Sequence, residues 1–280
     1  MELRYGERTW VMGVINLTPD SFSGDGLAPE GAPTEAVVAA AVDQAAAFVA
    51  AGAQLLDVGA ESTRPRQFYG ERRDVGADEE RAAVVPVVAA LAERFGAEVM
   101  VSADTSKGSV ARAALAAGAR MINDVWAARR DPDTARAAAE TGAHLVLMHN
   151  KDEATYAGDV VDEVITWLGD AVDAALDVGV ARGRLLIDPG IGFGKTGEHN
   201  LEILHRLGEV KAALGLPLLI GTSRKRFIGE LLGGVPPADR VEGTAATVAL
   251  AIAAGADVVR VHDVAHIART VRVADAIIRR

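Results

Sequence analysis

Ala51-Gly-Ala-Gln-Leu-Leu-Asp-Val58 joins the end of an expected helix to a short strand. Gly52 follows an alanine-rich amphipathic segment, at a position where a residue of left-handed conformation commonly ends a helix. The aliphatic run Leu55–Val58 comes soon after it and is typical of a buried strand in a parallel sheet. The same Ala-Gly-Ala junction recurs at 117–119 and at 254–256. The stretch therefore predicts a repeated unit in which strand and helix alternate.

Outward from this stretch, short apolar runs alternate with longer alanine-rich segments along the whole chain. The runs expected to form buried parallel strands are Val11–Ile15, Leu55–Val58, Val99–Ser102, Met121–Ile122, Leu145–Met148, Leu185–Ile187, Leu218–Ile220 and Val258–Val261. The segments long enough for crossover helices lie near 34–51, 79–94, 107–117, 132–141, 159–180, 199–213, 242–254 and 264–279. The glycines expected to end helices are Gly52, Gly96, Gly118, Gly142, Gly179 and Gly255.

This alternation favours an α/β protein whose fold is a (β/α)8 TIM barrel. The fold typically takes about 250 residues, and the chain has 280. No linker, low-complexity tract or change of composition divides the chain, so we expect a single domain over residues 1–280. A doubly wound sheet is the alternative, but nothing in the sequence marks a sheet edge or a switch point.

Composition narrows the possible partners and location. The formal net charge of −10 disfavours a general nucleic-acid or anionic-membrane surface. Cysteine is absent, which excludes disulfides, thiolate nucleophiles and cysteine zinc sites. Charged residues interrupt the apolar stretches before the roughly 20 residues that a membrane span needs. The segment Met1–Arg8 has no apolar region typical of a signal peptide. We therefore expect a cytoplasmic protein with no nucleic-acid or membrane partner.

Polar residues follow every one of the expected strands. They are Asn16, Glu61–Arg64, Asp104-Thr105, Asn123-Asp124, His149-Asn150, Asp188, Ser223–Lys225 and Arg260–Asp263. Any one of them could cap a helix or pair with a neighbouring charge. In a barrel, however, the carboxyl ends of all strands meet at one mouth, where the active site lies. The whole set therefore predicts an enzyme active site at that mouth.

One of these segments, Pro189–Thr196, resembles known phosphate-binding motifs without matching them. It ends like a Walker A loop, but Pro189 stands where the first glycine is required. Gly192, Gly194 and Gly197 fit a bare GxGxxG, yet no acidic residue follows at the spacing that a ribose would need. Alternating glycines can still let backbone approach a flat ligand closely, with Phe193 as an apolar wall.

The polar set suits a flat heterocycle that carries an anionic group. Asp104, Asp188 and Asn123 would match several ring N–H donors, as on a pterin or guanine edge. The basic residues expected at the same mouth are Arg64, Lys225, Arg260 and His262. They would supply locally the positive charge that the chain as a whole lacks.

Long motifs along nearly the whole chain resemble those of the dihydropteroate synthases. They are Met12-Gly-Val-Ile-Asn-Leu-Thr-Pro-Asp-Ser-Phe-Ser23, Asp57-Val-Gly-Ala-Glu-Ser-Thr-Arg-Pro65, Ser102-Ala-Asp-Thr105, Ile122-Asn-Asp-Val125, Met148-His149, Asp188–Lys195, Thr222-Ser-Arg-Lys225 and Arg260-Val-His-Asp-Val264. The resemblance implies a transferase of folate biosynthesis. Such an enzyme joins (7,8-dihydropterin-6-yl)methyl diphosphate to 4-aminobenzoate, with the help of Mg2+, to give 7,8-dihydropteroate and diphosphate.

The resemblance also implies roles for individual residues, and it implies a homodimer. The expected pterin-binding residues are Asp104, Asn123, Asp188, Lys225, Arg260, Met148, Phe193 and Gly221. Those expected to hold the diphosphate are Thr63, Arg260 and His262, with Asn16 linked to the magnesium ion. We expect the aminobenzoate pocket to include Phe22, Thr63, Arg64, Pro65, Phe193 and Ser223. The residues expected to act in catalysis are Arg260, His262, Lys225 and Asp25.

The chemistry poses a leaving-group problem, because the C–O bond to diphosphate must break for a weak aniline nucleophile to attack. We expect a dissociative path, in which the dihydropterin delocalises a developing methylene cation while basic groups neutralise the departing anion. A general base such as His149 or His262 is not needed, since an anilinium product loses its proton to water.

Two other functions are compatible with parts of the sequence. A methyltetrahydrofolate-dependent methyltransferase would share the pterin carboxylates but would not need the anion-binding set of Lys225, Arg260 and His262. A degenerate paralogue that binds pterin or diphosphate without turning it over is the second alternative. The chain departs from the usual family pattern at Gly24-Asp25, which displaces a carboxylate by one residue, and after Pro65, where Arg66 and a charged stretch to Asp74 replace the usual glycine.

Overall fold

The computed structural model describes residues 2–18, 32–61 and 74–280. Eight parallel strands form one sheet with the order β6-β5-β4-β3-β2-β1-β8-β7. The strands are β1 (Trp10–Asn16), β2 (Leu55–Gly59), β3 (Met100–Asp104), β4 (Met121–Asp124), β5 (His144–Met148), β6 (Leu185–Asp188), β7 (Leu219–Ile220) and β8 (Val258–Val261). A parallel bridge between Ile187 and Leu218 joins β6 to β7, so the sheet closes on itself. The predicted (β/α)8 barrel is confirmed.

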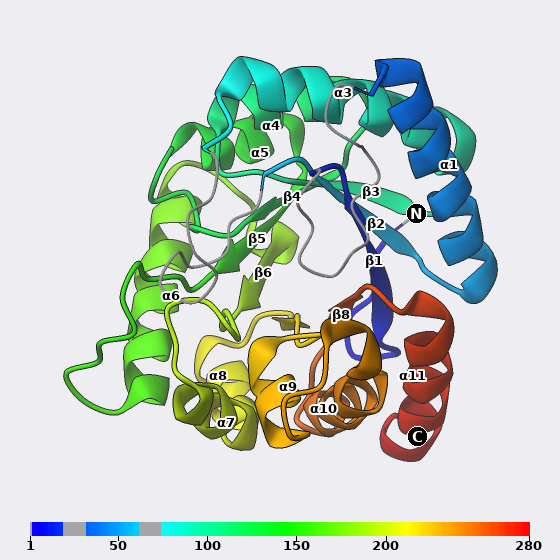
Figure 1. Cartoon of the computed structure of the whole chain (residues 1–280). Coiled ribbons are helices and arrows are strands. Elements are labelled where there is room, and N and C mark those ends of the chain that lie inside the picture. The colour runs from blue at the N-terminus through cyan, green and yellow to red at the C-terminus, as the bar shows by residue number, and fades with distance from the viewer. Residues whose placement is uncertain (1, 19–31, 62–73) are drawn as a thin grey trace.

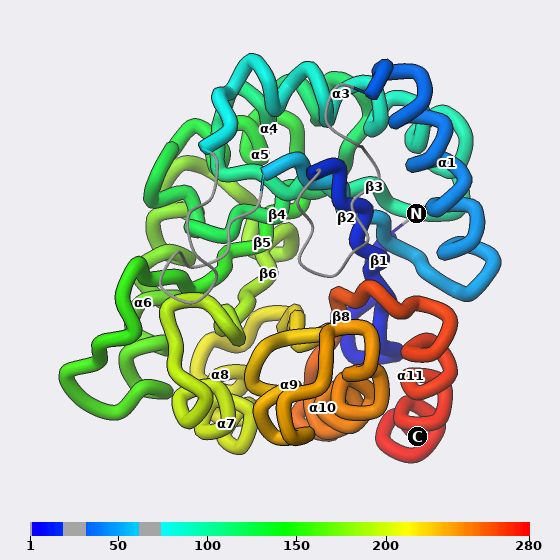
Figure 2. Tube along the Cα trace, in the orientation of Figure 1, coloured from blue at the N-terminus to red at the C-terminus, as the bar shows by residue number. Residues whose placement is uncertain are grey.

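Helices surround the strands, as Figure 1 shows. They are α1 (Thr34–Ala51), α3 (Ala77–Phe95), α4 (Gly108–Ala116), α5 (Asp133–Thr141), α6 (Val160–Asp177), α7 (Gly197–His205), α8 (Leu207–Leu214), α9 (Arg226–Leu231), α10 (Val241–Ala253) and α11 (Val264–Ile278). Short 3-10 turns lie at Arg182–Arg184 and Pro237–Asp239. Strands β1 and β8 come from opposite ends of the chain and pair side by side, which Figure 2 traces.

Three details differ from the sequence-based expectations. The helix expected over 199–213 is two helices, and α9 was not predicted. Gly96 ends α3 with φ −61°, in the ordinary helical region, so the expected left-handed ending is wrong there. Gly52 and Gly142 do adopt the left-handed conformation that was expected, with φ 107° and 69°.

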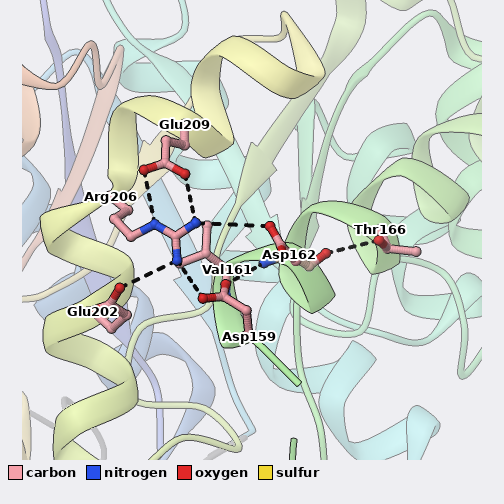
Figure 3. Close-up of polar contacts among 7 residues, drawn as sticks. All are labelled: Asp159, Val161, Asp162, Thr166, Glu202, Arg206 and Glu209. Carbon is pink, nitrogen blue, oxygen red and sulfur yellow. Dashed lines mark hydrogen bonds and ion pairs between the residues drawn. The ribbon is translucent and has the colours of Figure 1, made fainter. Parts of the chain in front are cut away.

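The break between α7 and α8 falls at Arg206, which leaves the helical conformation with φ −104° and ψ 22°. Its guanidinium donates to Glu209 at 2.8 and 2.9 Å and to Asp159 at 2.6 Å (Figure 3). Asp159 is also the N-cap of α6, accepting from the backbone N–H of Val161 and Asp162. One arginine therefore fastens the α7–α8 corner to the start of α6.

Alternation along the strands separates two apolar layers. Within β1, Met12 belongs to a cluster inside the barrel, whereas Val11 belongs to the larger cluster between strands and helices. The inner cluster also contains Leu3 and Trp10 from the N-terminal part of the chain, with Tyr5 packed against it. These residues fill the end of the barrel at which the strands begin, so polar groups are left to gather at the opposite end.

Among the described residues, α1 is long and apolar enough to cross a membrane by length and composition alone. Its apolar character comes largely from alanine, and it serves here as the crossover from β1 to β2. The Phe48 ring lies against the backbone of Gly13, where an added Cβ would come within 2.5 Å of a ring carbon. The apolar face of α1 thus covers the first strand of the barrel.

Candidate active site

The carboxyl ends of the strands bring the predicted pterin-site residues together. Asp104 is the last residue of β3 and lies opposite Asn123 of β4 in the strand register. Asp188 ends β6 opposite Met148 of β5. Arg260, from β8, reaches across the mouth and its Nη2 donates to Asp104 Oδ2 at 2.7 Å. Residues from five strands therefore meet at one mouth, as expected.

A buried carboxylate that the sequence analysis did not select connects these residues. Asp57 of β2 is fully buried, and its Oδ2 accepts from Arg260 Nε at 2.6 Å and from Asn123 Nδ2 at 2.9 Å. Its Oδ1 accepts from Ser102 Oγ at 2.6 Å. The signal was a charged residue inside an apolar strand, which is costly unless it is paired. Asp57 lies inside its strand, so the pattern of polar residues that follow each strand does not include it.

The network fixes the orientation of the Asn123 amide. Because the Asp57 carboxylate accepts, the Asn123 group that faces it must be the NH2, which donates. The Asn123 carbonyl oxygen is therefore the atom left to face the mouth. Together with the carboxylates of Asp104 and Asp188, it gives the site a set of acceptors.

Burial shapes the charges in this network. It raises the pKa of Asp104 to about 8, with Arg260 opposing the rise and Asp57 adding to it. Burial also raises the pKa of Asp188, opposed by Lys225 and by the backbone N–H of Gly190. For Arg260, burial alone would lower the pKa, but Asp57 and Asp104 raise it overall. Burial thus disfavours the ionised forms of Asp104 and Asp188, and the basic groups beside them oppose that effect.

Three glycines of the glycine-rich loop after β6 adopt the left-handed conformation. Gly190, Gly192 and Gly194 have φ values of 69°, 82° and 53°. A Cβ on Gly190 would lie 1.9 Å from the carbonyl oxygen of His149, and one on Gly194 would lie 2.4 Å from that of Lys151. The close approach found here is therefore to the chain's own loop after β5. This close packing of the two loops places the glycine-rich loop beside Asp188, whose Oδ1 accepts from Gly190 N at 2.7 Å.

Gly190→Ala is expected to destabilise the protein by about 2–4 kcal/mol, because a left-handed alanine costs about 1–2 kcal/mol and the overlap forces the backbone to move. Gly142→Ala is the matched control, since Gly142 has the same φ of 69° but nothing within 4 Å of an added Cβ. Urea unfolding of both variants measures the difference. An equal decrease in the free energy of unfolding of the two variants would show that the contact with His149 has no effect on stability.

An apolar wall borders the polar groups. Phe193 packs against a small cluster formed by Val125, Trp126 and Met148. Of these, Met148 and Phe193 were predicted from the sequence, whereas Val125 and Trp126 were not. Lys225 Nζ lies 4.4 Å from the centre of the Phe193 ring, so a cation and an aromatic face meet at the edge of the site.

The basic side of the mouth is built on the ends of β7 and β8. His262 Nδ1 lies 3.0 Å from Ser223 Oγ, which also accepts from the His262 backbone N–H at 3.1 Å. Arg224 pairs with Asp263 through two contacts of 2.6 and 2.9 Å. Gly221 lies beside Arg260, with 3.9 Å between an added Cβ and the Arg260 Cβ. The predicted residues Ser223, His262 and Arg260 therefore belong to one side of the site.

Asn16 ends β1, and its Oδ1 accepts from the backbone N–H and the hydroxyl of Thr18 at 3.1 and 2.7 Å. Glu61, at the end of a described segment, accepts from Lys107 Nζ at 2.6 Å, and the same amine donates to buried Glu80 at 2.5 Å.

Five predicted residues lie outside the described residues: Phe22, Asp25, Thr63, Arg64 and Pro65.

Residues 12–262 match the family model of the pterin-binding enzymes. The dihydropteroate synthase of Bacillus subtilis is 43% identical over 278 residues, covering 99% of this chain and 92% of that protein. A Clostridium difficile dihydropteroate synthase structure with pteroic acid has a TM-score of 0.90 at 40% identity and covers 100% of both chains. A Xanthomonas albilineans dihydropteroate synthase with 4-aminobenzoic acid has a TM-score of 0.86 at 42% identity, covering 97% of this chain and 94% of that one.

The family match spans the strands that carry Asp57, Asp104, Asn123, Asp188 and Arg260. Relatives of this identity extend over almost the full length of the chain, and the barrel agrees with theirs. The chain belongs to the dihydropteroate synthase family of pterin-binding enzymes.

Proposed function

We propose that this chain joins (7,8-dihydropterin-6-yl)methyl diphosphate to 4-aminobenzoate, giving 7,8-dihydropteroate and diphosphate in folate biosynthesis. One observation carries the proposal: the convergence of Asp104, Asn123, Asp188 and Arg260 at the barrel mouth. The test is detection of 7,8-dihydropteroate by mass spectrometry after incubation of the purified chain with both substrates and Mg2+. Methyl transfer from methyltetrahydrofolate to a corrinoid protein, without any dihydropteroate, would favour the methyltransferase alternative.

The pterin ring binds among the acceptors at the mouth. Asp104, Asp188 and the Asn123 carbonyl accept from its ring N–H and amino groups, and Lys225 donates to its carbonyl. The ring lies against the apolar wall that contains Met148 and Phe193, with Gly221 leaving room and Arg260 packing on the opposite face. All these groups belong to one domain that covers residues 1–280.

Displacement of diphosphate is dissociative. The C–O bond at the pterin methylene breaks and its electron pair leaves with the diphosphate oxygen. Arg260, His262 and Thr63 bind the departing anion, while Lys225 and Asp25 complete the charged surroundings of the reacting carbon. The aminobenzoate nitrogen then forms the new C–N bond, and the resulting anilinium loses a proton to water. Preorganised charge on the leaving-group side is what lowers the barrier.

Aminobenzoate binds between the pterin and the loops after β1 and β2. Phe193 supplies an apolar wall and Ser223 a hydroxyl near the carboxylate, supported by their positions beside Lys225 and His262. The other members of this pocket are Phe22, Thr63, Arg64 and Pro65, as the family resemblance implies.

Mg2+ would be held together with the diphosphate rather than in an all-protein cage. In the described part of the chain, no three His, Cys, Asp or Glu residues gather as a metal site. Mg2+ typically keeps several waters and binds substrate phosphates with one or two protein ligands. Asn16 Oδ1, oriented by Thr18, fits a single ligand of that kind once the Thr18 hydroxyl turns away. When bound, the cation would neutralise charge on the diphosphate.

Removal of Mg2+ by EDTA is therefore expected to lower turnover by at least about tenfold, because charge on the leaving group is no longer neutralised. Diphosphate release is measured in EDTA and again after excess Mg2+ is added back. Full activity in EDTA would contradict the role given to the metal and to Asn16.

The chain forms a homodimer in the cytoplasm. Support for the dimer comes from α10 and α11, which pack side by side (Figure 1) and carry the exposed apolar residues Leu250, Val273 and Ile277. Exposed apolar side chains on neighbouring helices are the kind of surface at which subunits can associate. Leu250→Glu is expected to convert the dimer to a monomer in light scattering, whereas an unchanged mass would place the interface elsewhere.

A further inference from the structure

Behind the glycine-rich loop lies a group of three side chains, which we call the rear cluster: His149 and Lys195 are buried, and Tyr156 is half-buried. Lys195 is 2% exposed, and its Nζ lies 2.8 Å from His149 Nδ1 and donates to the carbonyl oxygen of Phe193 at 3.0 Å. The Tyr156 hydroxyl donates to the next carbonyl oxygen, that of Gly194, at 2.8 Å. Two consecutive peptide groups of the loop are thus held from behind.

The rear cluster is itself fixed by ring contacts. The rings of His149 and Tyr156 stack with 6.2 Å between centres and an angle of 27°. Trp167 meets the His149 ring edge-on at 4.9 Å, and His199 meets the Tyr156 ring edge-on at 4.7 Å. Helices α6 and α7 supply these two flanking rings. The cluster therefore links the loop to the rigid helical layer.

Burial disfavours the charged form of both members of the buried amine–imidazole pair. Burial lowers the pKa of Lys195 well below its usual range, and burial together with Lys195 lowers that of His149. Lys195 Nζ can donate to the Phe193 carbonyl oxygen in either protonation state, so this contact does not depend on its charge. Lys225 lies on the other side of the same loop.

The loop is also held from the side of the mouth. Lys225 Nζ donates to the carbonyl oxygen of Ile191, two residues before Phe193. In the proposed function, Lys225 donates to the pterin carbonyl, and so it must share or leave this contact when the pterin arrives. The contacts of Lys195 and Tyr156 do not depend on the ligand, so they remain.

We propose that Lys195 and Tyr156 are positioning residues that hold Phe193 in place while Lys225 engages the pterin, and that they thereby set the affinity for the aromatic amine substrate. The pterin has four polar partners at the mouth, so a small displacement of Phe193 lowers the affinity for the pterin only slightly. The aminobenzoate ring depends on Phe193 as an apolar wall, so the same displacement lowers the affinity for aminobenzoate more. This inference rests on the proposed function.

Lys195→Met and Tyr156→Phe test it, because each removes a donor and keeps most of the buried volume. Tyr5→Phe is the matched control: Tyr5 is also a largely buried phenol that contacts a histidine, but it lies at the other end of the barrel. We expect Lys195→Met to raise the KM for 4-aminobenzoate about tenfold and Tyr156→Phe about threefold, in line with about 0.5–1.5 kcal/mol per hydrogen bond. The Kd for the pterin diphosphate should stay within about twofold in both.

The control variant should change neither constant. Unchanged KM for aminobenzoate in both variants, or an equal weakening of both substrates, would overturn the inference. If Lys195→Met fails to fold, Tyr156→Phe decides alone, since it removes only a hydroxyl. Failure of the proposed function is distinct, because the wild-type chain would then make no dihydropteroate.

Discussion

Asp188→Ala is expected to abolish measurable pterin binding, raising the Kd by about 100-fold or more. Asp188 is 6% exposed and faces Lys225, while its Oδ1 accepts from Gly190 N at 2.7 Å. Truncation removes the acceptor for the ring, leaves the buried Gly190 N–H without its partner and removes a negative charge that interacts with Lys225. Losing one partner of a buried charged contact costs about 2–5 kcal/mol. Titration calorimetry with the pterin diphosphate measures the effect.

Asp188→Asn provides the comparison, because its amide oxygen can still accept from Gly190 while the negative charge is lost. We expect it to fold like the wild type and to bind the pterin more weakly than wild type but better than Asp188→Ala. Wild-type pterin affinity in Asp188→Ala would refute the assignment of this carboxylate to the ring.

Asp57→Asn is expected to lower kcat/KM by about 100-fold to 1,000-fold, comparable to the loss of a preorganised charge in an active site. The variant keeps the shape of the side chain but removes the charge that holds Arg260 Nε. It also lets the Asn123 amide turn over, because an asparagine at 57 can donate as well as accept. Binding of the diphosphate leaving group and binding of the pterin ring should therefore both weaken. Steady-state kinetics with both substrates provide the measurement.

Ser102→Ala separates this role from general stability. It removes the 2.6 Å contact to Asp57 Oδ1 and leaves the Arg260 and Asn123 contacts intact. We expect kcat/KM within about fivefold of the wild type, with a loss of stability of about 1 kcal/mol. If Asp57→Asn and Ser102→Ala have equal kinetic effects, Asp57 does not act by positioning Arg260 and Asn123.

The barrel could be predicted because its signals are local. Apolar runs and the Ala-Gly-Ala junctions report the strand and helix at the same place in the chain. The break between α7 and α8 at Arg206 could not be predicted in this way. Arg206 pairs there with carboxylates at the start of α6, which come close only in the folded chain. Helix α9, over Arg226–Leu231, is too short for a clear periodic pattern.

In the site, too, residues marked by a local sequence signal could be predicted, whereas contacts formed only on folding could not. Asp104, Asn123 and Asp188 could be found because a polar residue at a strand end is visible in the sequence. The role of Asp57 depends on Arg260, which is 203 positions away and becomes a neighbour only through the β1–β8 pairing that closes the barrel. Lys195 looked like the end of a phosphate motif, but folding buries it against His149, 46 positions earlier.

Dihydropteroate synthase activity is tested by diphosphate release from the purified chain, measured with the pterin diphosphate and Mg2+ in the presence and absence of 4-aminobenzoate. We expect sustained release that requires 4-aminobenzoate and matches the dihydropteroate formed mole for mole. Release that is independent of 4-aminobenzoate, or no release with both substrates present, would contradict it.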